Sequence, residues 1–493
     1  MQVVERAHQF SHRIAIRDKH QTYTYQDLID KASKIAHHLL GNQKDLQEAR
    51  IAFLTEASFE YTTIQWGIWL AGAVAVPLCT LHPLPSLEYV IDNAEASILI
   101  ADDINYAKLS ELATQKKIPL FLCSAFQKEL EAKPLPFIED SRRAMILYTS
   151  GTTNLPKGVV STHSNINFQI ESLVNAWHWQ KEDHIVNVLP LHHVHGIINV
   201  MSSALWVGAC CQFMPKFNPQ NLWTIFKEGN VNLFMAVPTI YFKLIAFWDQ
   251  SSSEEQNKMS KALQSFRLMI SGSAALPVPV LEKWQKISGH TLLERYGMTE
   301  IGMAISNPYD SERRAGHIGQ PLKGVQIRLS NQDEIVEKDC ASGEIQIKGP
   351  NVFKEYWKKP EATAEAFTED GWFRSGDIAV LNANYYKILG RDSVDIIKSG
   401  GYKISALEIE DVLRQHKAII DAAVVGLSDP EWGEKVVACI LIRKDVPFET
   451  DAVKSWLKQR LAVYKIPKHF IIRDKLPRNV LCKVTKKELR TWF

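Results

Sequence analysis

The sequence has 493 residues, enough for about two to four domains with a large hydrophobic core. Its 57 basic and 55 acidic residues leave a net charge of +2, so no charge excess favours nucleic acid or an anionic membrane as the main partner. The seven cysteines are odd in number and scattered without a CxxC pair, which favours free thiols in a reducing compartment. The N-terminus is polar and lacks an apolar signal core, so we expect a cytoplasmic protein.

Apolar runs of strand length alternate with helical patterns over most of the chain. This alternation predicts an α/β fold with largely parallel sheets. Residues 61–87 carry no charge, but Pro77, Pro83 and Pro85 interrupt them, so we expect a buried helix leading into a strand over 66–79 rather than a membrane span. The other predicted strands include 97–101, 144–147, 185–189, 232–236 and 267–270, and the predicted helices include 25–40, 222–227 and 278–288.

The segments become shorter after about residue 390. A helix is expected over 406–416, strands over 422–426 and 436–442, and a further helix over 453–461. This succession predicts a small α+β domain of roughly 100 residues. We therefore expect an N-terminal domain of layered sheets and helices over 1–390 and a C-terminal domain, called the lid below, over 391–493.

A loop rich in hydroxyl groups and glycine follows the strand predicted at 144–147. Glycine lets the backbone approach a ligand closely, hydroxyl and N–H groups donate, and lysine supplies a cation, so such a loop can wrap a nucleotide triphosphate. It is not a Walker A loop, because Pro156 removes a backbone donor before Lys157. The alternative for the loop alone is a surface turn without a ligand. Its residues are Thr149, Ser150, Gly151, Thr152, Thr153, Asn154, Leu155, Pro156 and Lys157.

Three further stretches stand after this loop in the chain. They are Tyr296-Gly-Met-Thr-Glu300, Gly371-Trp-Phe-Arg-Ser-Gly-Asp377, and Gly390-Arg391 followed by Asp395-Ile-Ile-Lys398-Ser-Gly-Gly. Together with the loop they resemble, in order and over nearly the whole chain, the motifs of the acyl-adenylate-forming enzymes, which include the acyl-CoA synthetases. Asn154 stands where that family usually has glycine. Asparagine tolerates a positive φ angle better than most residues, so we expect the turn to survive.

The resemblance implies a two-step reaction that uses ATP, Mg²⁺ and coenzyme A. A carboxylate attacks the α-phosphorus of ATP to give an acyl-adenylate and pyrophosphate, and the thiolate of coenzyme A then displaces AMP. Charge passes onto oxygens in both steps, so cations and hydrogen-bond donors carry the catalysis. The family roles assign the β- and γ-phosphates to the loop 149–157, the α-phosphate to Thr299, and Mg²⁺ to Glu300. The alternative for Thr299 and Glu300 is a helix N-cap with an acidic first turn.

The same resemblance implies a nucleoside site. Asp377 would accept bonds from both ribose hydroxyls, because a carboxylate offers only acceptors to a vicinal diol. Arg391 would help to bind ribose and phosphate, and the alternative is that the two residues form a surface salt bridge. Residues expected near the adenine are Ser273 and Ala274, with Tyr296 stacked on the base and followed by Gly297 and Met298.

A lysine near the C-terminus completes the implied site. Lys483 matches the family lysine that reaches the α-phosphate and the attacking carboxylate, although Cys482 replaces the usual glycine before it. The alternatives are Lys486, Lys487 or a solvated lysine. In the family the small domain rotates between the two steps, with the pivot here expected at Asp392 or Ser393. Lys398, Gly400 and Gly401 would then face the coenzyme A tunnel in the thioester-forming state.

Arg295 is the residue that bears on the acid substrate. Enzymes of the family that activate aromatic or fatty acids usually have a small residue there. A buried unpaired guanidinium disfavours an alkyl tail, whereas its planar fork suits a second carboxylate, so a short diacid such as malonate is expected. Stretches such as Leu189-Pro-Leu-His-His-Val-His-Gly196 also resemble the malonyl-CoA synthetases, including the form found in mitochondria, and imply a role in fatty acid metabolism.

His193 and His195 are expected on one face of an extended segment that lines the acyl pocket, with buried core histidines as the alternative. The function that these patterns favour is an AMP-forming malonate–CoA ligase. Rival hypotheses are another short acid (methylmalonate, acetate or propionate), transfer of the adenylate to a carrier protein, and an inactive scaffold that binds an acyl-adenylate. The patterns leave the oligomeric state open.

Overall fold

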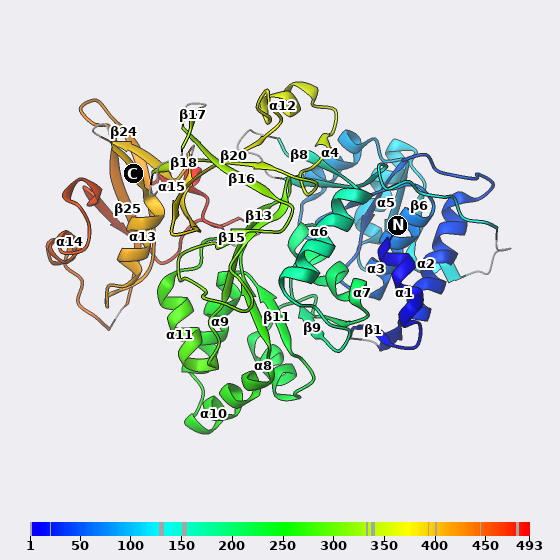
Figure 1. Cartoon of the computed structure of the whole chain (residues 1–493), viewed down its shortest axis with the longest axis horizontal. Coiled ribbons are helices and arrows are strands. Elements are labelled where there is room, and N and C mark those ends of the chain that lie inside the picture. Colours follow the sequence, from blue (N-terminus) through cyan, green and yellow to red (C-terminus); the bar gives the residue numbers. More distant parts are fainter. Residues whose placement is uncertain are drawn as a thin grey trace.

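The structure is a computed structural model of the chain, and it confirms the predicted α/β class. Two large mixed sheets and one antiparallel sheet build the N-terminal part, and a separate small sheet builds the C-terminal part (Figure 1). No helix among the described residues is long and apolar enough to cross a membrane. The residues described are 2–19, 21–127, 133–149, 155–331, 334–336, 341–392, 394–399, 402–443, 445–479 and 483–493.

The first large sheet has seven strands in the order β19-β8-β7-β4-β3-β5-β6. Its five central and outer strands β3 to β7 run parallel, whereas β8 and β19 are antiparallel to their neighbours. The expected buried helix over 66–79 is confirmed as the end of α3 followed by β4, with Trp66 and Trp69 fully buried. The bounds are β3 Arg50–Leu54, β4 Val74–Pro77, β5 Ile98–Ala101, β6 Leu120–Leu122, β7 Arg143–Thr149, β8 Lys157–Thr162, β19 Glu355–Tyr356, α2 Tyr25–Leu40, α3 Phe59–Leu70, α4 Leu84–Ala94 and α5 Tyr106–Lys116.

The second large sheet has nine strands in the order β15-β14-β13-β12-β11-β9-β10-β1-β2. Its centre is parallel and buried, as the continuous apolar runs predict. The bounds are β1 Ile14–Arg17, β2 Thr22–Thr24, β9 His184–Asn187, β10 Cys210–Phe213, β11 Leu233–Ala236, β12 Leu268–Ser271, β13 Leu293–Met298, β14 Gly302–Ser306, β15 Gln320–Pro321, α1 Gln2–Ala7, α6 His163–Ala176, α7 Ser203–Val207, α8 Pro219–Lys227, α9 Pro238–Asp249, α10 Ser253–Ala262 and α11 Val278–Ser288.

A third sheet departs from the expected alternation of parallel strands and helices. It is a five-stranded antiparallel sheet in the order β17-β16-β18-β20-β21, joined by hairpins and bulges. Its strands alternate buried and exposed positions, so the sequence shows no long apolar run that would mark them. The bounds are β16 Gln326–Asn331, β17 Glu334–Ile335, β18 Ser342–Lys348, β20 Phe373–Asn382, β21 Tyr385–Arg391 and α12 Pro360–Glu365.

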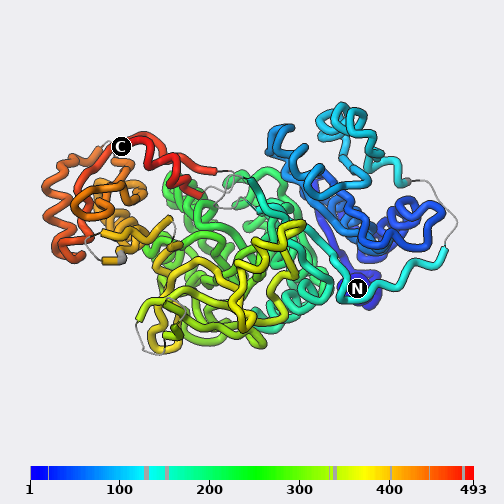
Figure 2. The backbone as a smooth tube through the Cα atoms, turned by 90° about the horizontal axis from the view of Figure 1, so that it is seen from above, coloured from blue at the N-terminus to red at the C-terminus, as the bar shows by residue number. Residues whose placement is uncertain are grey.

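The C-terminal sheet forms a separate body at one end of the molecule (Figure 2). It has the order β23-β22-β25-β24, with β26 added to β25, and its hydrophobic clusters contain only residues of this region. The helices and strands expected after residue 390 are confirmed, with boundaries shifted by a few residues. The bounds are β22 Ile396–Ser399, β23 Tyr402–Ser405, β24 Ile419–Asp429, β25 Gly433–Ile442, β26 His469–Ile472, α13 Ala406–Arg414, α14 Thr450–Lys458 and α15 Lys486–Arg490.

Candidate active site

The phosphate-loop sequence joins two antiparallel strands. Thr149 ends β7 and lies opposite Lys157, which begins β8, and no helix follows directly, unlike in a Walker A loop. Tyr89 Oη donates to the Pro156 carbonyl at 2.8 Å and Tyr148 Oη donates to Asn93 Oδ1 at 2.8 Å, so both arms of the hairpin are fixed. Leu155 is exposed. The predicted phosphate-binding residues Ser150, Gly151, Thr152, Thr153 and Asn154 lie outside the described residues.

A buried carboxylate lies close to the base of this hairpin. Glu300 is 6% exposed, and Tyr356 Oη donates to its Oε1 at 2.9 Å. The Lys157 ammonium lies 4.9 Å from the centre of the Tyr356 ring, so a cation and an anion flank one tyrosine. Burial raises the pKa of Glu300, and the hydroxyl bond opposes that shift. No motif in the sequence marked Tyr356, which comes from β19 in a distant segment.

Glu300 fits the chemistry of a magnesium ligand. It is a carboxylate with one hydroxyl partner, and no described cluster of three or more His, Cys, Asp or Glu side chains could enclose a metal by itself. Mg²⁺ is commonly held by one or two carboxylates together with water and phosphate oxygens. Thr299 and Glu300 lie in the turn between β13 and β14, so the helix N-cap alternative is wrong.

A hydrogen bond between Tyr296 and Asp377 connects β13 to β20. Tyr296 Oη donates to Asp377 Oδ2 at 2.7 Å, and Arg391 Nε lies 3.6 Å from Asp377 Oδ1. The salt bridge considered from sequence therefore exists, but Asp377 is mostly buried, and burial raises the pKa of its carboxyl. Gly297 sits at a bulge where a Cβ atom would lie 1.9 Å from the Gly302 carbonyl, which explains the glycine, and Met298 ends the strand.

Arg295 is buried, and no described residue forms an ion pair with it. Arg295 is 3% exposed, and its only hydrogen bonds within the described part of the chain are long ones, 3.4 and 3.5 Å, to Ser273 Oγ. Its Nε has no partner among the described residues, and burial lowers the pKa of the guanidinium to about 9. Gly272 leaves room for it, since a Cβ there would lie 2.5 Å from the guanidinium carbon. Such a buried, unpaired cation is costly unless an anion joins it.

Ser273 lies against this guanidinium. Its φ angle is +67°, a conformation that L-residues rarely adopt, and it follows the end of β12. Its Oγ is 3.1 Å from His195 Nδ1, so a serine hydroxyl links arginine and histidine. The side chain predicted near the adenine therefore contacts the arginine pocket, whereas Ala274 is exposed beside it.

Four histidines gather next to this pocket. The predicted extended segment is wrong: His192 and His193 lie in a turn, and His195 begins a π-helix, His195–Ser202. The ring centres of His192 and His193 are 4.1 Å apart, and His82, which sequence reasoning missed, lies 6.2 Å from His192. Burial lowers the pKa of each, to about 4 for His193, so all four are neutral donors or acceptors at neutral pH.

Lys483 reaches this region from the C-terminal part. It precedes α15. The pKa of its ammonium is lowered, first because nearby protein atoms displace water from it and then because Arg391 and Arg295 repel its positive charge. Asp377 and Asp395 oppose the shift, and the lysine in turn lowers the pKa of His193. Lys483 therefore lies close enough to Asp377, Arg391 and Arg295 to interact with them electrostatically.

The other two lysine candidates have different surroundings. Lys486 is buried in ion pairs with Asp395 and Glu410, whereas Lys487 is exposed on α15. Lys398, expected at the coenzyme A tunnel, is exposed on β22 and lies 3.4 Å from Asp392. Gly400, Gly401, Ser393 and Cys482 lie outside the described residues.

A nucleotide-type loop, a buried carboxylate and a lysine from a second domain define an enzyme of the adenylate-forming class. The chain belongs to the AMP-binding enzyme family: residues 3–357 match the AMP-binding enzyme domain and 408–483 match the AMP-binding enzyme C-terminal domain. It is 44% identical to the mitochondrial malonate–CoA ligase ACSF3 of Xenopus laevis, over 100% of this chain and 92% of that protein.

Solved structures show the same fold. ATP-bound MatB from Rhodopseudomonas palustris is 31% identical, with a TM-score of 0.91 over 100% of this chain and 98% of that one. The apo form of MatB, over the same shares of both chains, gives 0.83 at 31% identity. The chain thus superposes better on the ATP-bound form.

Glu294, next to Arg295, predicts a pH dependence of stability. Its carboxyl is buried and accepts one hydrogen bond from the Gly316 N–H at 3.0 Å, and burial raises its pKa to about 8. The unfolded carboxyl ionises near its ordinary pKa of about 4.3, so the folded state binds the extra proton between these values. Stability from this group is complete below the lower value and declines as the pH rises towards 8.

Glu294→Gln keeps an acceptor for Gly316 but cannot ionise. Its stability relative to the unsubstituted protein should therefore rise between pH 5 and pH 8, by an amount on the order of a few kcal/mol. Urea midpoints at pH 5, 6.5 and 8 measure this difference. If the urea midpoints of the two proteins changed with pH in the same way, the raised pKa of Glu294 would be contradicted.

Proposed function

We propose that this protein is an AMP-forming malonate–CoA ligase, which converts malonate, ATP and coenzyme A into malonyl-CoA, AMP and pyrophosphate. The observation that carries the choice of acid is Arg295, a buried guanidinium without a carboxylate partner among the described residues. A planar fork of donors binds a carboxylate in two parallel bonds. Malonate has a second carboxylate one carbon away from the reacting one, and the relatives named as malonate–CoA ligases support the same acid.

In the first step, the reacting carboxylate of malonate attacks the α-phosphorus of ATP and pyrophosphate leaves. The hairpin 149–157 binds the β- and γ-phosphates, Thr299 donates to the α-phosphate, and Lys483 neutralises charge that develops on the transferring oxygens. Asp377 and Arg391 hold the ribose, and Tyr296, which is bonded to Asp377, borders the base. Mg²⁺ held by Glu300 would screen the repulsion between phosphate oxygens and the attacking carboxylate.

Arg295 and the neutral histidines hold the distal carboxylate during this step. Ser273 can accept from Arg295 and donate to His195 Nδ1. His195 Nε2–H, which is buried and has no hydrogen-bond partner among the residues that the structure describes, is then free to donate to substrate. The pocket that we assign to the acid therefore combines one cation with neutral donors. That composition disfavours fatty acids, because an alkyl tail would leave the cation unpaired.

In the second step, the thiolate of coenzyme A attacks the acyl carbon and AMP leaves. We propose that residues 391–493 form a lid that rotates about Asp392 or Ser393 and brings Lys398, Gly400 and Gly401 to the coenzyme A tunnel. The present arrangement suits the first step, because Lys483 is near Asp377 while Lys398 faces solvent. The higher TM-score to ATP-bound MatB supports this assignment.

We also propose the cytoplasm as the compartment. The five described cysteines are all free, as expected in a reducing environment. The relatives named mitochondrial provide the competing location, and fractionation of cells that express the natural full-length gene product distinguishes the two.

Pyrophosphate release over a panel of acids tests the function. With ATP, Mg²⁺ and coenzyme A present, kcat/KM should be largest for malonate, lower for methylmalonate by about tenfold, and lower still for acetate, propionate and fatty acids. Omitting coenzyme A should stop turnover after about one equivalent of adenylate. Faster turnover with a fatty acid than with malonate would contradict the role given to Arg295.

A further inference from the structure

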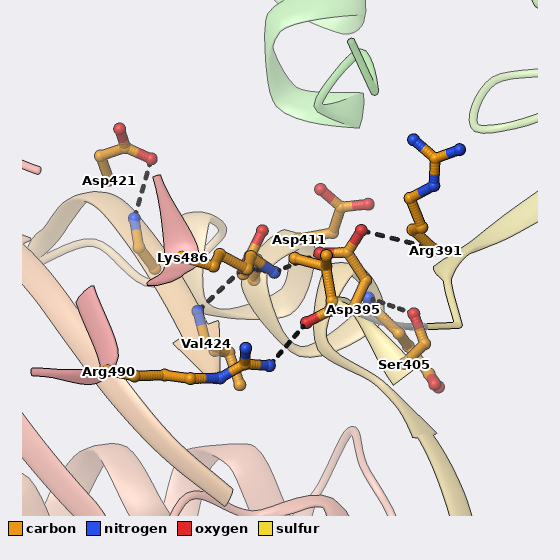
Figure 3. A network of polar contacts seen from close by, with 12 residues as sticks. Arg391, Asp395, Ser405, Asp411, Asp421, Val424, Lys486 and Arg490 are labelled. Atoms are coloured by element: carbon orange, nitrogen blue, oxygen red, sulfur yellow. Dashed lines mark hydrogen bonds and ion pairs between the residues drawn. The ribbon is translucent and has the colours of Figure 1, made fainter. Parts of the chain in front are cut away.

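A cluster of buried ions lies in the lid around Lys486 (Figure 3). At its centre, Lys486 Nζ lies 2.6 Å from Asp395 Oδ1 and 2.8 Å from Glu410 Oε1. Lys486 is 6% exposed and Glu410 is 4% exposed, so water screens these pairs little. Glu410 also accepts from the Val424 N–H at 2.8 Å and lies 3.5 Å from Arg414. The lid ion cluster below means Lys486, Asp395, Glu410 and Arg414.

Asp395 connects this cluster to the proposed pivot. Its Oδ2 accepts from the Arg391 N–H at 3.1 Å, while its own N–H donates to the Arg391 carbonyl at 2.7 Å. Arg391 is the last residue of β21 and pairs with Asp377 across the sheet. The carboxylate of Asp395 therefore connects the end of β21 to Lys486. Arg490, on the same short helix as Lys486, donates to the Val394 carbonyl at 3.3 Å and fastens the helix to this segment a second time.

Lys486 is also connected to the segment that carries Lys483. Lys486 begins α15 three residues after Lys483. The Asn479 N–H donates to the Lys483 carbonyl at 2.9 Å, and the Lys483 N–H donates to Asn479 Oδ1 at 3.0 Å. On the upstream side of this loop, Arg478 lies 2.6 Å from Asp421 on β24. The main chain of Lys483 is thus fixed on both sides to the lid.

We propose that Lys486 is a positioning residue for the adenylation step: through Asp395 it fixes the main chain of Lys483 relative to Arg391 at the pivot. Lys486 does not itself touch substrate. The inference rests on the proposed role of Lys483 in adenylation. It predicts that Lys486 matters for the step in which Lys483 acts and not for thioester formation, in which Lys483 has moved away.

Stability alone gives a poor reason for this arrangement. A buried ion cluster is often no more stable than apolar side chains of the same volume, because its ions lose their hydration. Burial opposes the charge of Lys486, but Glu410 and Asp395 outweigh it and raise the pKa of the ammonium. Together the two ion pairs fix the position of Lys486 Nζ relative to two carboxylates from different segments, and an apolar contact would not do so.

The test compares Lys486→Met with Lys487→Met, its exposed neighbour on the same helix. Each half-reaction is measured separately: pyrophosphate release from malonate and ATP, and malonyl-CoA formation from supplied malonyl-adenylate. We expect Lys486→Met to slow adenylation by about 10- to 100-fold, because misplacing a catalytic group by an ångström has effects of this size. Its thioester formation and its KM for ATP should stay within about twofold, and Lys486→Arg should restore most of the adenylation rate, whereas Lys487→Met should change neither step.

A second variant covers the case in which Lys486→Met destabilises the lid. Asp395→Asn has the same volume and keeps an acceptor for the Arg391 N–H, but it has no charge for Lys486, and it should show the same selective loss. Equal losses in both half-reactions for both variants, or unchanged adenylation in Lys486→Met, would overturn the proposal. If the unsubstituted enzyme activates another acid but not malonate, the proposed substrate is wrong, and the comparison is made with that acid.

Discussion

Lys483→Ala is expected to slow malonyl-adenylate formation by about 10²- to 10³-fold and to leave thioester formation from supplied malonyl-adenylate within about threefold. The ammonium of Lys483 interacts electrostatically with Arg295, Arg391 and Asp377, whereas Lys398, which we assign to the coenzyme A face of the lid, is exposed in this arrangement. Loss of a donor directed at developing negative charge affects only the step in which that charge develops. Stopped-flow or single-turnover assays of each half-reaction measure the difference.

Lys398→Ala is the matched control, because it removes an exposed lysine from another segment of the lid, the strand β22. It should preserve adenylation and lower the rate of thioester formation, the reverse of the Lys483 result. Lys483→Ala should not unfold the lid, since the side chain is exposed and forms no ion pair with a described residue. If Lys483→Ala slowed both half-reactions equally, the role assigned to Lys483 would be wrong.

The local chemistry of the site could be read from the sequence because it resides in short contiguous motifs. Position 297, for example, needs glycine because a side chain there would collide with the backbone of its own hairpin. The parallel strands could be predicted because they are buried on both faces and appear as apolar runs. The third sheet could not, since its half-exposed strands give weaker patterns and its hairpins do not force helices between strands.

Residues that join the site from distant segments were beyond sequence reasoning. Tyr356 reaches Glu300 only because β19 pairs with β8, and His82 reaches His192 only because the segment after β4 lies beside the turn before the π-helix. Neither has a motif around it that marks a role. Lys486 stood close to a predicted catalytic lysine in the chain, but its burial depends on Asp395 and Glu410, which local patterns cannot bring together.

The pocket around Arg295 combines both kinds of information. The arginine was visible as a departure from the family pattern, but its lack of a partner is a property of the fold. Gly272 provides the space, Ser273 accepts the only hydrogen bonds from the guanidinium within the described residues, and no described carboxylate pairs with it. A protein that keeps such a cation without a ligand accepts a loss of stability, and the binding of an anion recovers it.

Arg295→Met is therefore expected to lower kcat/KM for malonate by about 10²- to 10³-fold, which corresponds to about 3–4 kcal/mol for a buried charge-assisted pair. Activity with acetate or propionate should be unchanged or higher, because the apolar side chain no longer leaves a cation unpaired beside the methyl group. Kinetic constants for all three acids measure this change in preference. Arg295→Lys keeps the charge but not the planar fork, so its kcat/KM for malonate should lie between those of the unsubstituted protein and Arg295→Met.

Thermal stability separates a substrate role of Arg295 from a structural one. Without ligand, Arg295→Met should melt at the same or a higher temperature than the unsubstituted protein, since it removes a buried ion that has no carboxylate partner among the described residues. Malonate, in the presence of a non-hydrolysable ATP analogue, should raise the melting temperature of the unsubstituted protein but not of the variant. A variant that melts much lower and loses activity with every acid to the same extent would show that Arg295 supports the fold. In that case the preference for a diacid would have to come from the histidines of the same pocket, and replacing His193 and His195 would shift the acid profile instead.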